Sequence, residues 1–331
     1  MKANFIFRTA SVAICAFILA LVPAHAQLSS QLEEKTFPVG DFTSISISDD
    51  FEISLVRGIC SAKVTADKEL FPYVQVYVRG KVLHITYDEK SVPKDIKKLY
   101  KGRGAPTPVF RAVVSIPTLG AITLSNNVSL TSTEEFSATD FELNLSDKAQ
   151  IRNLSLKTSG ATLNMKKNAQ ALLNIRADKR LEINTEGNAN LKLTADAAEL
   201  SVASAGSSEL ALSIDTKQAT LNLGGSSNVN LALETEHLTL QTAGSSKLTL
   251  TGVSDEMSVR GEKSSLVEAN GFSVKKLDAN LSGSSRVNAN VSEHIDATLV
   301  GGSALYYTGT PTILIGKIIK STLAPYGSSS K

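Results

Sequence analysis

The chain is poor in aromatic residues and in cysteine. Among its 331 residues there is no Trp, Phe and Tyr together make up 5%, and Cys occurs twice. Aromatic side chains fill much of the interior of an ordinary globular core. The shortage therefore indicates an interior packed with smaller aliphatic side chains.

The chain also lacks an excess of charge of either sign. Its 34 basic and 32 acidic residues give a formal net charge of +2, which argues against a dedicated nucleic-acid binder. Charged residues at 20% and hydrophobic residues at 42% exclude a disordered chain and a polytopic membrane protein.

The first 26 residues have the pattern of an export signal. Lys2 and Arg8 precede an apolar run over residues 12–22, and Ala24-His25-Ala26 is a cleavage pattern that predicts Gln27 as the mature start. The run is short for a transmembrane helix, although an uncleaved anchor remains the alternative. The prediction is export to the periplasm, the outer-membrane surface or the outside of the cell, with no transmembrane span.

Cleavage after residue 26 also removes one of the two cysteines. Only Cys60 would remain, so no intramolecular disulfide could form and the exported domain would depend on its own core. No basic or His residue lies beside Cys60 in sequence. We interpret it as a small buried residue rather than a reactive thiol.

The clearest pattern is an internal repeat. Gly-Ser-Ser recurs at residues 206–208, 225–227, 244–246 and 283–285, and Lys263-Ser264-Ser265 fills the gap, with spacings of 19, 19, 19 and 20. The same register extends upstream to Gly187, Lys167, Asp147 and Asn126 and downstream to Gly301. Positions four before and four after this turn are apolar in every copy, for example Leu221 and Val229.

Between the turns, apolar and polar residues alternate, which is the period of a β-strand. A repeat of 19–20 residues is too short for a propeller blade and does not have the helical period of a helix-pair solenoid. The fold class predicted is all-β: a right-handed, single-stranded parallel β-helix with one rung per repeat.

The repeat begins once, stops and resumes. Residues 45–55 match residues 122–130, so we predict a first rung over residues 42–58, an insertion and a return to the solenoid near residue 119. Strand-like runs at 62–66, 73–78, 81–87 and 110–116, with a hairpin at Arg79-Gly80, predict a β-rich cap over the open end. The predicted domains are 1–26 signal, 27–118 first rung and cap, 119–320 β-helix with residues 313–319 in a closing cap, and 321–331 flexible tail.

These features resemble the GIN-domain family, described as "putative auto-transporter adhesin, head domain". The resemblance spans roughly residues 36–320 and depends on the opening rung 42–55, the hairpin end 81–85, and the late segments 282–287, 301–303 and 307–311. It implies an exported β-helix of Gram-negative bacteria with an adhesin-like function and carries no catalytic residue onto this chain. The chain departs from the pattern at Lys263, where the turn Gly is replaced.

No catalytic or metal-binding motif is evident. His84, His237 and His294 are scattered, and there is no zinc motif, nucleophile elbow or phosphate loop. Asp49-Asp50, at a predicted corner, favours turn hydrogen bonding over a calcium site. We therefore predict a non-enzymatic protein without a cofactor.

One polar column is the best candidate for binding. Three residues before each turn, amide side chains recur on the predicted outer face: Asn144, Asn164, Asn184, Asn222 and Asn280. Such a column is either an amide ladder that stabilises stacking or a polar strip that binds a glycan or a cell-surface component.

Three functional hypotheses remain. The first is an adhesin-like protein that binds a surface or a glycan. The second is a periplasmic structural or assembly module that acts through its ends, with a homo-oligomer as its natural form. The third is a polysaccharide lyase or hydrolase on a β-helix, which would require acids on neighbouring rungs.

Overall fold

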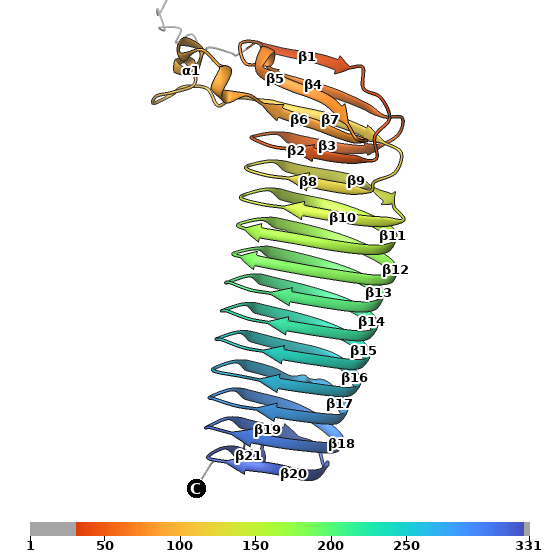
Figure 1. The fold of residues 1–331 in the computed structure, drawn as a ribbon, viewed down its shortest axis with the longest axis vertical. Coiled ribbons are helices and arrows are strands. Elements are labelled where there is room, and N and C mark those ends of the chain that lie inside the picture. Colours follow the sequence, from red (N-terminus) through yellow and green to blue (C-terminus); the bar gives the residue numbers. More distant parts are fainter. Residues whose placement is uncertain (1–30, 328–331) are drawn as a thin grey trace, which may run out of the picture.

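The computed structural model describes residues 31–327, which form a rod of stacked β-coils with a β-rich cap at one end (Figure 1). The predicted signal segment and its cleavage site lie outside the described residues. Among residues 31–327, no helix has the length and apolar character needed to cross a membrane.

Long strands that run from one turn to the next build the rod. The strands β11 to β18 each wrap once around it and pair in parallel with the next strand. The rod starts with β8 (Ala121–Leu124), β9 (Ser129–Ser137) and β10 (Asp140–Leu145) and continues with β11 (Gln150–Lys167), β12 (Gln170–Gly187), β13 (Asn190–Ser204), β14 (Glu209–Leu223), β15 (Asn228–Thr242), β16 (Lys247–Gly261), β17 (Leu266–Leu281) and β18 (Arg286–Val300). The predicted parallel β-solenoid, with about 11 turns, is confirmed.

The predicted turn column forms one tight corner of every coil. All its members have positive φ, between 60° and 81°: Asp49, Asn126, Asp147, Lys167, Gly187, Gly206, Gly225, Gly244, Lys263, Gly283 and Gly301. Lys263, at 62°, keeps the left-handed conformation although it is not a glycine. The register found in the sequence is therefore the register of the backbone.

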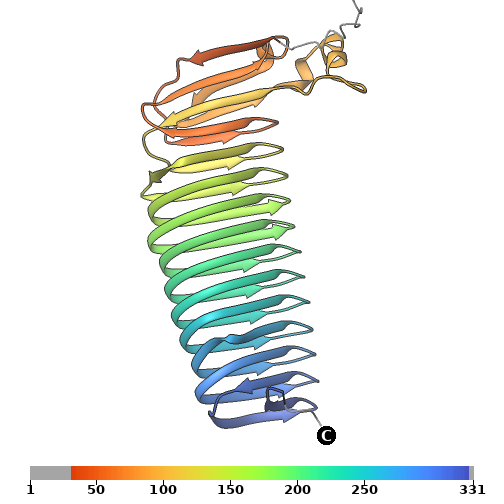
Figure 2. The same cartoon turned by 180° about the vertical axis from the view of Figure 1, so that it is seen from behind.

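A second corner, on the opposite edge, was not predicted. There the strands bend, one or more residues are left out of the strand pairing, and Thr or Ser hydroxyls donate to carbonyls of the same and the preceding coil. Thr216 Oγ1, for example, lies 3.1 Å from the carbonyl oxygens of both Ala198 and Gln218. We call the edge with the positive-φ turns the turn edge and the opposite edge the bend edge. Figure 2 shows the smooth bends of the strands at the bend edge. They divide each coil into a face before the turn and a face after it.

The interior explains the shortage of aromatic residues. From residue 142 to residue 271 the sequence contains no aromatic residue, and the buried side chains of β12 to β16 are aliphatic or small. Near the turn edge the interior includes hydroxyls that bond between coils: Thr185 Oγ1 lies 2.8 Å from Ser204 Oγ, which lies 3.0 Å from Ser227 Oγ. At the two ends of this stretch the coils also bury aromatic rings, those of Phe141 and Phe272, so aliphatic stacking is the rule over β12 to β16 and not a limit of the whole rod.

The N-terminal cap extends the sheet beyond the first coil. That coil consists of β2 (Ser44–Ile47) and β3 (Glu52–Arg57), on which β6 (Val82–Tyr87) and β7 (Phe110–Ile116) pair in parallel. Antiparallel β5 (Val74–Arg79) and β4 (Ser61–Asp67) follow, and the hairpin joining β5 to β6 has positive φ at Gly80 and Lys81. The inserted cap is therefore confirmed. Two of its elements were not predicted: the edge strand β1 (Leu32–Phe37) and the helix α1 (Lys94–Leu99).

The C-terminal end differs from the expectation. The segment expected to close the rod forms β20 (Thr312–Ile319), an ordinary coil strand in parallel with β18, with a register shift near Gly316. Part of the expected tail forms β21 (Thr322–Pro325), parallel to β19 (Ala304–Thr308). The strand periodicity continues through β21, and within residues 31–327 no element covers the last coil.

Candidate functional site

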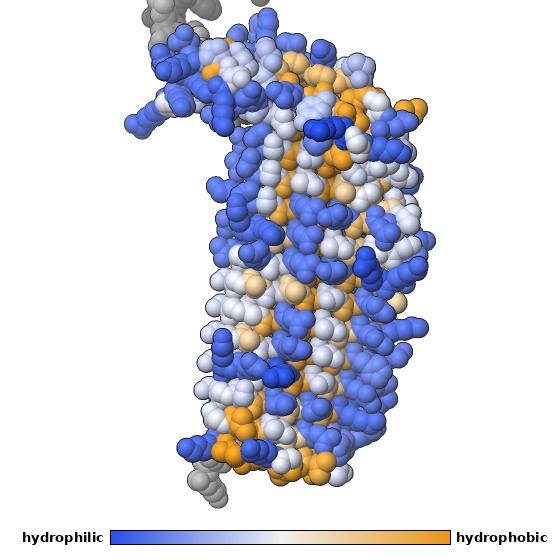
Figure 3. All heavy atoms as spheres, viewed as in Figure 1, coloured by the Kyte–Doolittle hydropathy of each residue, from blue (hydrophilic) through white to orange (hydrophobic). Residues whose placement is uncertain are grey.

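A groove of about 640 Å³ lies on the face before the turn, across β11 to β16. Its floor is formed by the outward column next to the turn, where three successive coils have Ala205, Gly224 and Ala243. The neighbouring coils have Lys166, Glu186 and Glu262 in the same column. The hollow exists because three small residues follow one another between larger ones; Figure 3 shows this face, with pale small residues among polar ones.

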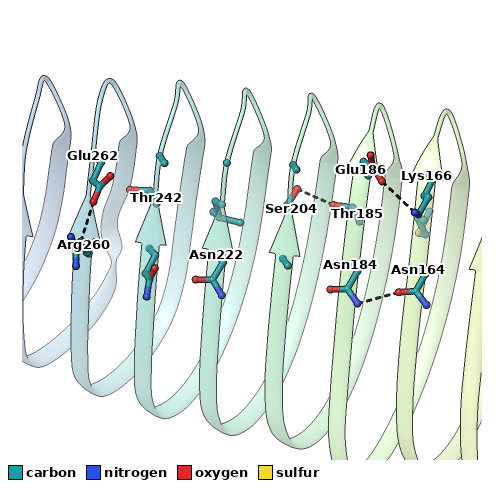
Figure 4. Close-up of a pocket in the computed structure, with 17 residues that line it drawn as sticks. Asn164, Lys166, Asn184, Thr185, Glu186, Ser204, Asn222, Thr242, Arg260 and Glu262 are labelled. Atoms are coloured by element: carbon teal, nitrogen blue, oxygen red, sulfur yellow. Dashed lines mark hydrogen bonds and ion pairs between the residues drawn. The ribbon is translucent and has the colours of Figure 1, made fainter.

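Each end of the groove has an ion pair. Lys166 Nζ lies 3.4 Å from Glu186 Oε2, and Arg260 Nε lies 3.1 Å from Glu262 Oε1 (Figure 4). The two carboxylates are four coils apart, which is about 19 Å at the usual strand spacing. Each pair is exposed and contributes little to stability, so both remain available to a ligand.

The predicted amide column forms one wall of the groove, and it divides into two parts. Asn164 Nδ2 donates to Asn144 Oδ1 at 3.0 Å, and Asn184 Nδ2 donates to Asn164 Oδ1 at 3.1 Å. These three side chains are half-buried, and they form the stabilising ladder that was one of the two interpretations.

Beyond Ala203 the ladder stops. The side chains of Asn222 and Gln241 are exposed, line the groove and make no hydrogen bond with any residue the structure describes. Figure 4 shows Asn222 standing alone beside the linked Asn164 and Asn184. Asn280 is also exposed and unbonded within residues 31–327, but it lies outside the groove. Of the five predicted residues, Asn164, Asn184 and Asn222 therefore line the groove, and of these three only Asn222 has a free amide.

The other polar candidates are occupied by local contacts. Asp49 Oδ2 accepts from Ser48 Oγ at 2.9 Å and from the Tyr87 amide at 3.1 Å, and its Oδ1 accepts from Asn126 at 3.1 Å. His237 lies 3.3 Å from Glu256, and His294 lies 3.3 Å from Asp296. Residues 31–327 contain no group of three His, Cys, Asp or Glu side chains arranged to hold a metal ion.

One arrangement was missed in the sequence. Asp196, Asp215 and Glu234 pair in register on three consecutive coils near the bend edge, where all three are exposed. They line two shallow hollows of about 310 and 500 Å³. Their spacing is the 19-residue period itself, so following that period from Asp196 would have found them.

The solved structures to which this chain is similar include three proteins of Parabacteroides. Adhesins labelled putative from Parabacteroides distasonis and Parabacteroides merdae are each 16% identical over 90% of this chain, cover 98% and 97% of their own lengths, and have TM-scores of 0.37 and 0.34. A second P. distasonis protein, titled a putative lipid binding protein, also has a TM-score of 0.37 at 16% identity, with 90% of this chain and 97% of that chain covered. No curated protein matches the sequence.

The family comparison covers most of the chain. The sequence pattern of the family described as "Putative auto-transporter adhesin, head GIN domain" matches residues 41–230 and 213–311, which cover the first coil, the cap except β1, and the solenoid to β19. The chain belongs to this family of head GIN domains.

Proposed function

We propose that this protein is an exported, adhesin-like rod that binds an extended polar ligand, a glycan of the cell surface or matrix, in the groove on the face before the turn. The observation that supports this is the combination of a small-residue floor with the unpaired amides of Asn222 and Gln241. A purely structural ladder would have bonded these amides to their neighbours, as it does at Asn164.

The chemistry of the groove favours a carbohydrate over a peptide. An amide both donates and accepts hydrogen bonds, as does a sugar hydroxyl. The floor offers no deep apolar pocket for a peptide side chain to anchor. No aromatic residue occurs from 142 to 271, so the groove cannot stack a sugar ring on an aromatic face. Single-site affinity is therefore expected to be weak and to rise when several copies bind one surface.

Filling the groove tests this proposal. Gly224 has an ordinary φ, and a Cβ built there meets only the Ser204 carbonyl oxygen, at 3.7 Å, so Gly224→Leu fills the floor without disturbing the coil. Ala211→Leu is the matched control, since Ala211 is exposed on the opposite face. Asn222→Ala removes the free amide.

The measurement is binding to a panel of bacterial and host polysaccharides, by array and then by calorimetry. We expect the wild type and Ala211→Leu to bind the same glycan and Gly224→Leu and Asn222→Ala to lose at least tenfold in affinity. A folded wild type that binds nothing in the panel, or a Gly224→Leu variant that binds unchanged, contradicts the proposal.

The stacked acids support a second candidate, cleavage of a polysaccharide at the bend edge. Asp196, Asp215 and Glu234 are on adjacent coils, and two carboxyls about 5 Å apart suit a retaining glycosidase. Their exposure weakens this candidate, because a glycosidase holds the sugar chain and the reacting water in a fixed position between its two carboxyls, and these acids lie in shallow, open hollows. If the wild type releases reducing ends from a panel polysaccharide and Asp215→Asn does not, the enzymatic function replaces the adhesive one.

A further inference from the structure

The C-terminal end of the rod exposes a cluster of large apolar side chains. Leu314 is 60% exposed, Ile315 55%, Ile319 46% and Tyr326 53%. They lie within the last coil, and Figure 3 shows apolar surface at this lower end of the rod. A patch of this kind on an otherwise polar protein is typical of an interaction site.

The register shows that part of this patch is an unfinished core. Ile315 pairs with Ala297 and Ile318 with Leu299, whose exposed fractions are 2% and 0%. Ile315 and Ile318 therefore continue columns that are buried in every earlier coil, yet Ile318 is still 36% exposed. Only a further coil would cover them.

The backbone of the last coil is also unfinished. Among the described strands, β20 pairs only with β18, so its other edge faces away from the rod with no strand beside it, and the same is true of residues 322–324 of β21, which pairs only with β19. Free strand edges of this kind are templates for pairing with another chain. The end thus offers both apolar side chains and unpaired N–H and C=O groups.

The other end of the rod also has strand edges without a partner, because β1 pairs only with β4 and β5 only with β6 among the described strands, but its outermost strand is charged. There β4 and β1 add antiparallel strands over the first coil, and the outermost strand, β1, has the charged residues Glu33, Glu34 and Lys35. Charged residues are a common means of blocking an edge. The charged edge of β1 makes the N-terminal end a poorer partner for the apolar C-terminal coil than a second C-terminal coil is.

We propose that two copies of this protein associate through their C-terminal coils. A twofold axis perpendicular to the rod would place β20 beside β20 and β21 beside β21 as antiparallel pairs, and each copy would cover the exposed Ile315 and Ile318 of the other. Such an isologous contact closes on itself and gives a dimer of twice the length.

The size of the end indicates a weak dimer. A coil about 26 Å long has two sheets about 10 Å apart, and with the side chains outside each sheet it is about 20 Å wide, so its end covers about 500 Å², or about 1,000 Å² for both partners. This is at the low end for a specific interface, so we expect a dissociation constant of micromolar order. The register shift near Gly316 shortens the edge of β20 that can pair.

The charges of the last coil add a distinctive salt dependence. Residues 312–327 include Lys317 and Lys320 and no acid. A twofold contact brings these like charges together, so added salt should strengthen the dimer by screening them. An association driven by opposite charges would instead become weaker as salt is added.

The test is sedimentation velocity of the full mature chain from 1 to 300 μM, at 20 and at 500 mM NaCl. We expect a monomer–dimer equilibrium that shifts towards the dimer in high salt, without larger species. Ile315→Lys with Ile318→Lys should weaken dimerisation at least tenfold. Leu32→Lys, which alters an exposed residue of β1 at the other end, is the matched control and should dimerise as the wild type does.

A second variant distinguishes loss of the interface from local unfolding of the last coil. Leu314 points outward in β20, so Leu314→Lys adds charge beside the proposed partner strand without entering the core. In a Cys60→Ser background, spin labels at Thr322→Cys should give a short distance between copies, whereas labels at Glu33→Cys should not. A strict monomer at 300 μM, growth beyond dimers, or an end-variant that dimerises unchanged would overturn the proposal.

Discussion

Gly225 and Gly224 are adjacent glycines in one coil, and we predict opposite effects when each is replaced by Ala. Gly225 is in the turn column with φ of +67°, and a Cβ there would lie 2.5 Å from the carbonyl oxygen of Gly206 in the preceding coil. Gly224 has no such constraint, because the nearest atom to its Cβ would be 3.7 Å away.

The magnitude follows from two effects. An Ala residue in the left-handed region costs about 1–2 kcal/mol, and the close contact with Gly206 forces a backbone shift worth about 1–2 kcal/mol more. Lys167 and Lys263 show that the column accepts an L-residue at this φ. The close contact with Gly206 therefore decides how much Gly225→Ala lowers the free energy of unfolding. For Gly224→Ala, loss of freedom in the unfolded chain should stabilise by about 0.4–1 kcal/mol.

The two variants should therefore differ by about 3 kcal/mol in the free energy of unfolding, with Gly225→Ala the less stable. Urea denaturation followed by circular dichroism measures the difference. Amide hydrogen exchange locates it, because in a solenoid each coil contacts only its neighbours, so the loss of protection should centre on β14 and β15. Equal midpoints for the two variants would refute the assignment of the turn column as the close-contact corner.

Three further changes test the core, the ladder and the cap. Leu221→Ala, in a fully buried column, should cost about 2–5 kcal/mol, whereas Leu172→Ala, at a side chain that is 46% exposed, should cost under about 0.5 kcal/mol; urea midpoints compare them. Asn164→Ala removes both ladder hydrogen bonds and should cost about 1–2 kcal/mol, while Asn222→Ala should leave thermal unfolding unchanged. Burial, with the nearby Glu89 carboxylate, raises the pKa of Tyr87 to about 12, so the folded state holds this proton more tightly than the unfolded chain does. The stabilisation from this raised pKa is complete below about pH 10 and disappears as the pH rises through 12. Thermal melts at several pH values should show this loss of stability in the wild type and not in Tyr87→Phe. The same loss in both proteins would contradict the assignment to Tyr87.

The repeat made most of the fold predictable. A period of 19 residues with two apolar columns determines which residues face inward. The same period identifies the turn column from the sequence alone, and its members Asn126, Asp147, Lys167 and Gly187 all have positive φ. Local spacing carries this information because each coil stacks on an equivalent one.

The unpredicted features lack such a repeated signal. At the bend edge most coils have Thr, Ser or Ala, and no residue type typical of a turn recurs there. The sequence therefore gave no sign of this second corner. β1 and α1 belong to the cap, which occurs once and has no period. The end of the rod was misjudged because the apolar run 313–319 indicates burial equally well in a cap and in an uncovered coil.

The binding site was predictable in position but not in detail. The amide column was identified residue by residue, yet only the structure separates the bonded Asn164 from the free Asn222. The groove exists because Ala205, Gly224 and Ala243 are small. In a sequence, small residues indicate a surface groove and a tightly packed contact equally well, so the groove could not be predicted from them.

The direction of the strands has a mechanical consequence. They lie across the rod, so the hydrogen bonds between coils run along it (Figure 1). Tension applied between residues 31 and 327, at opposite ends, would load one interface at a time instead of shearing many bonds together. Such a rod would yield by peeling coil after coil from an end and lengthening by a roughly constant step of 19 residues at each release. A tether built in this way absorbs stretching at low force while the remaining coils, and the groove across β11 to β16, stay folded.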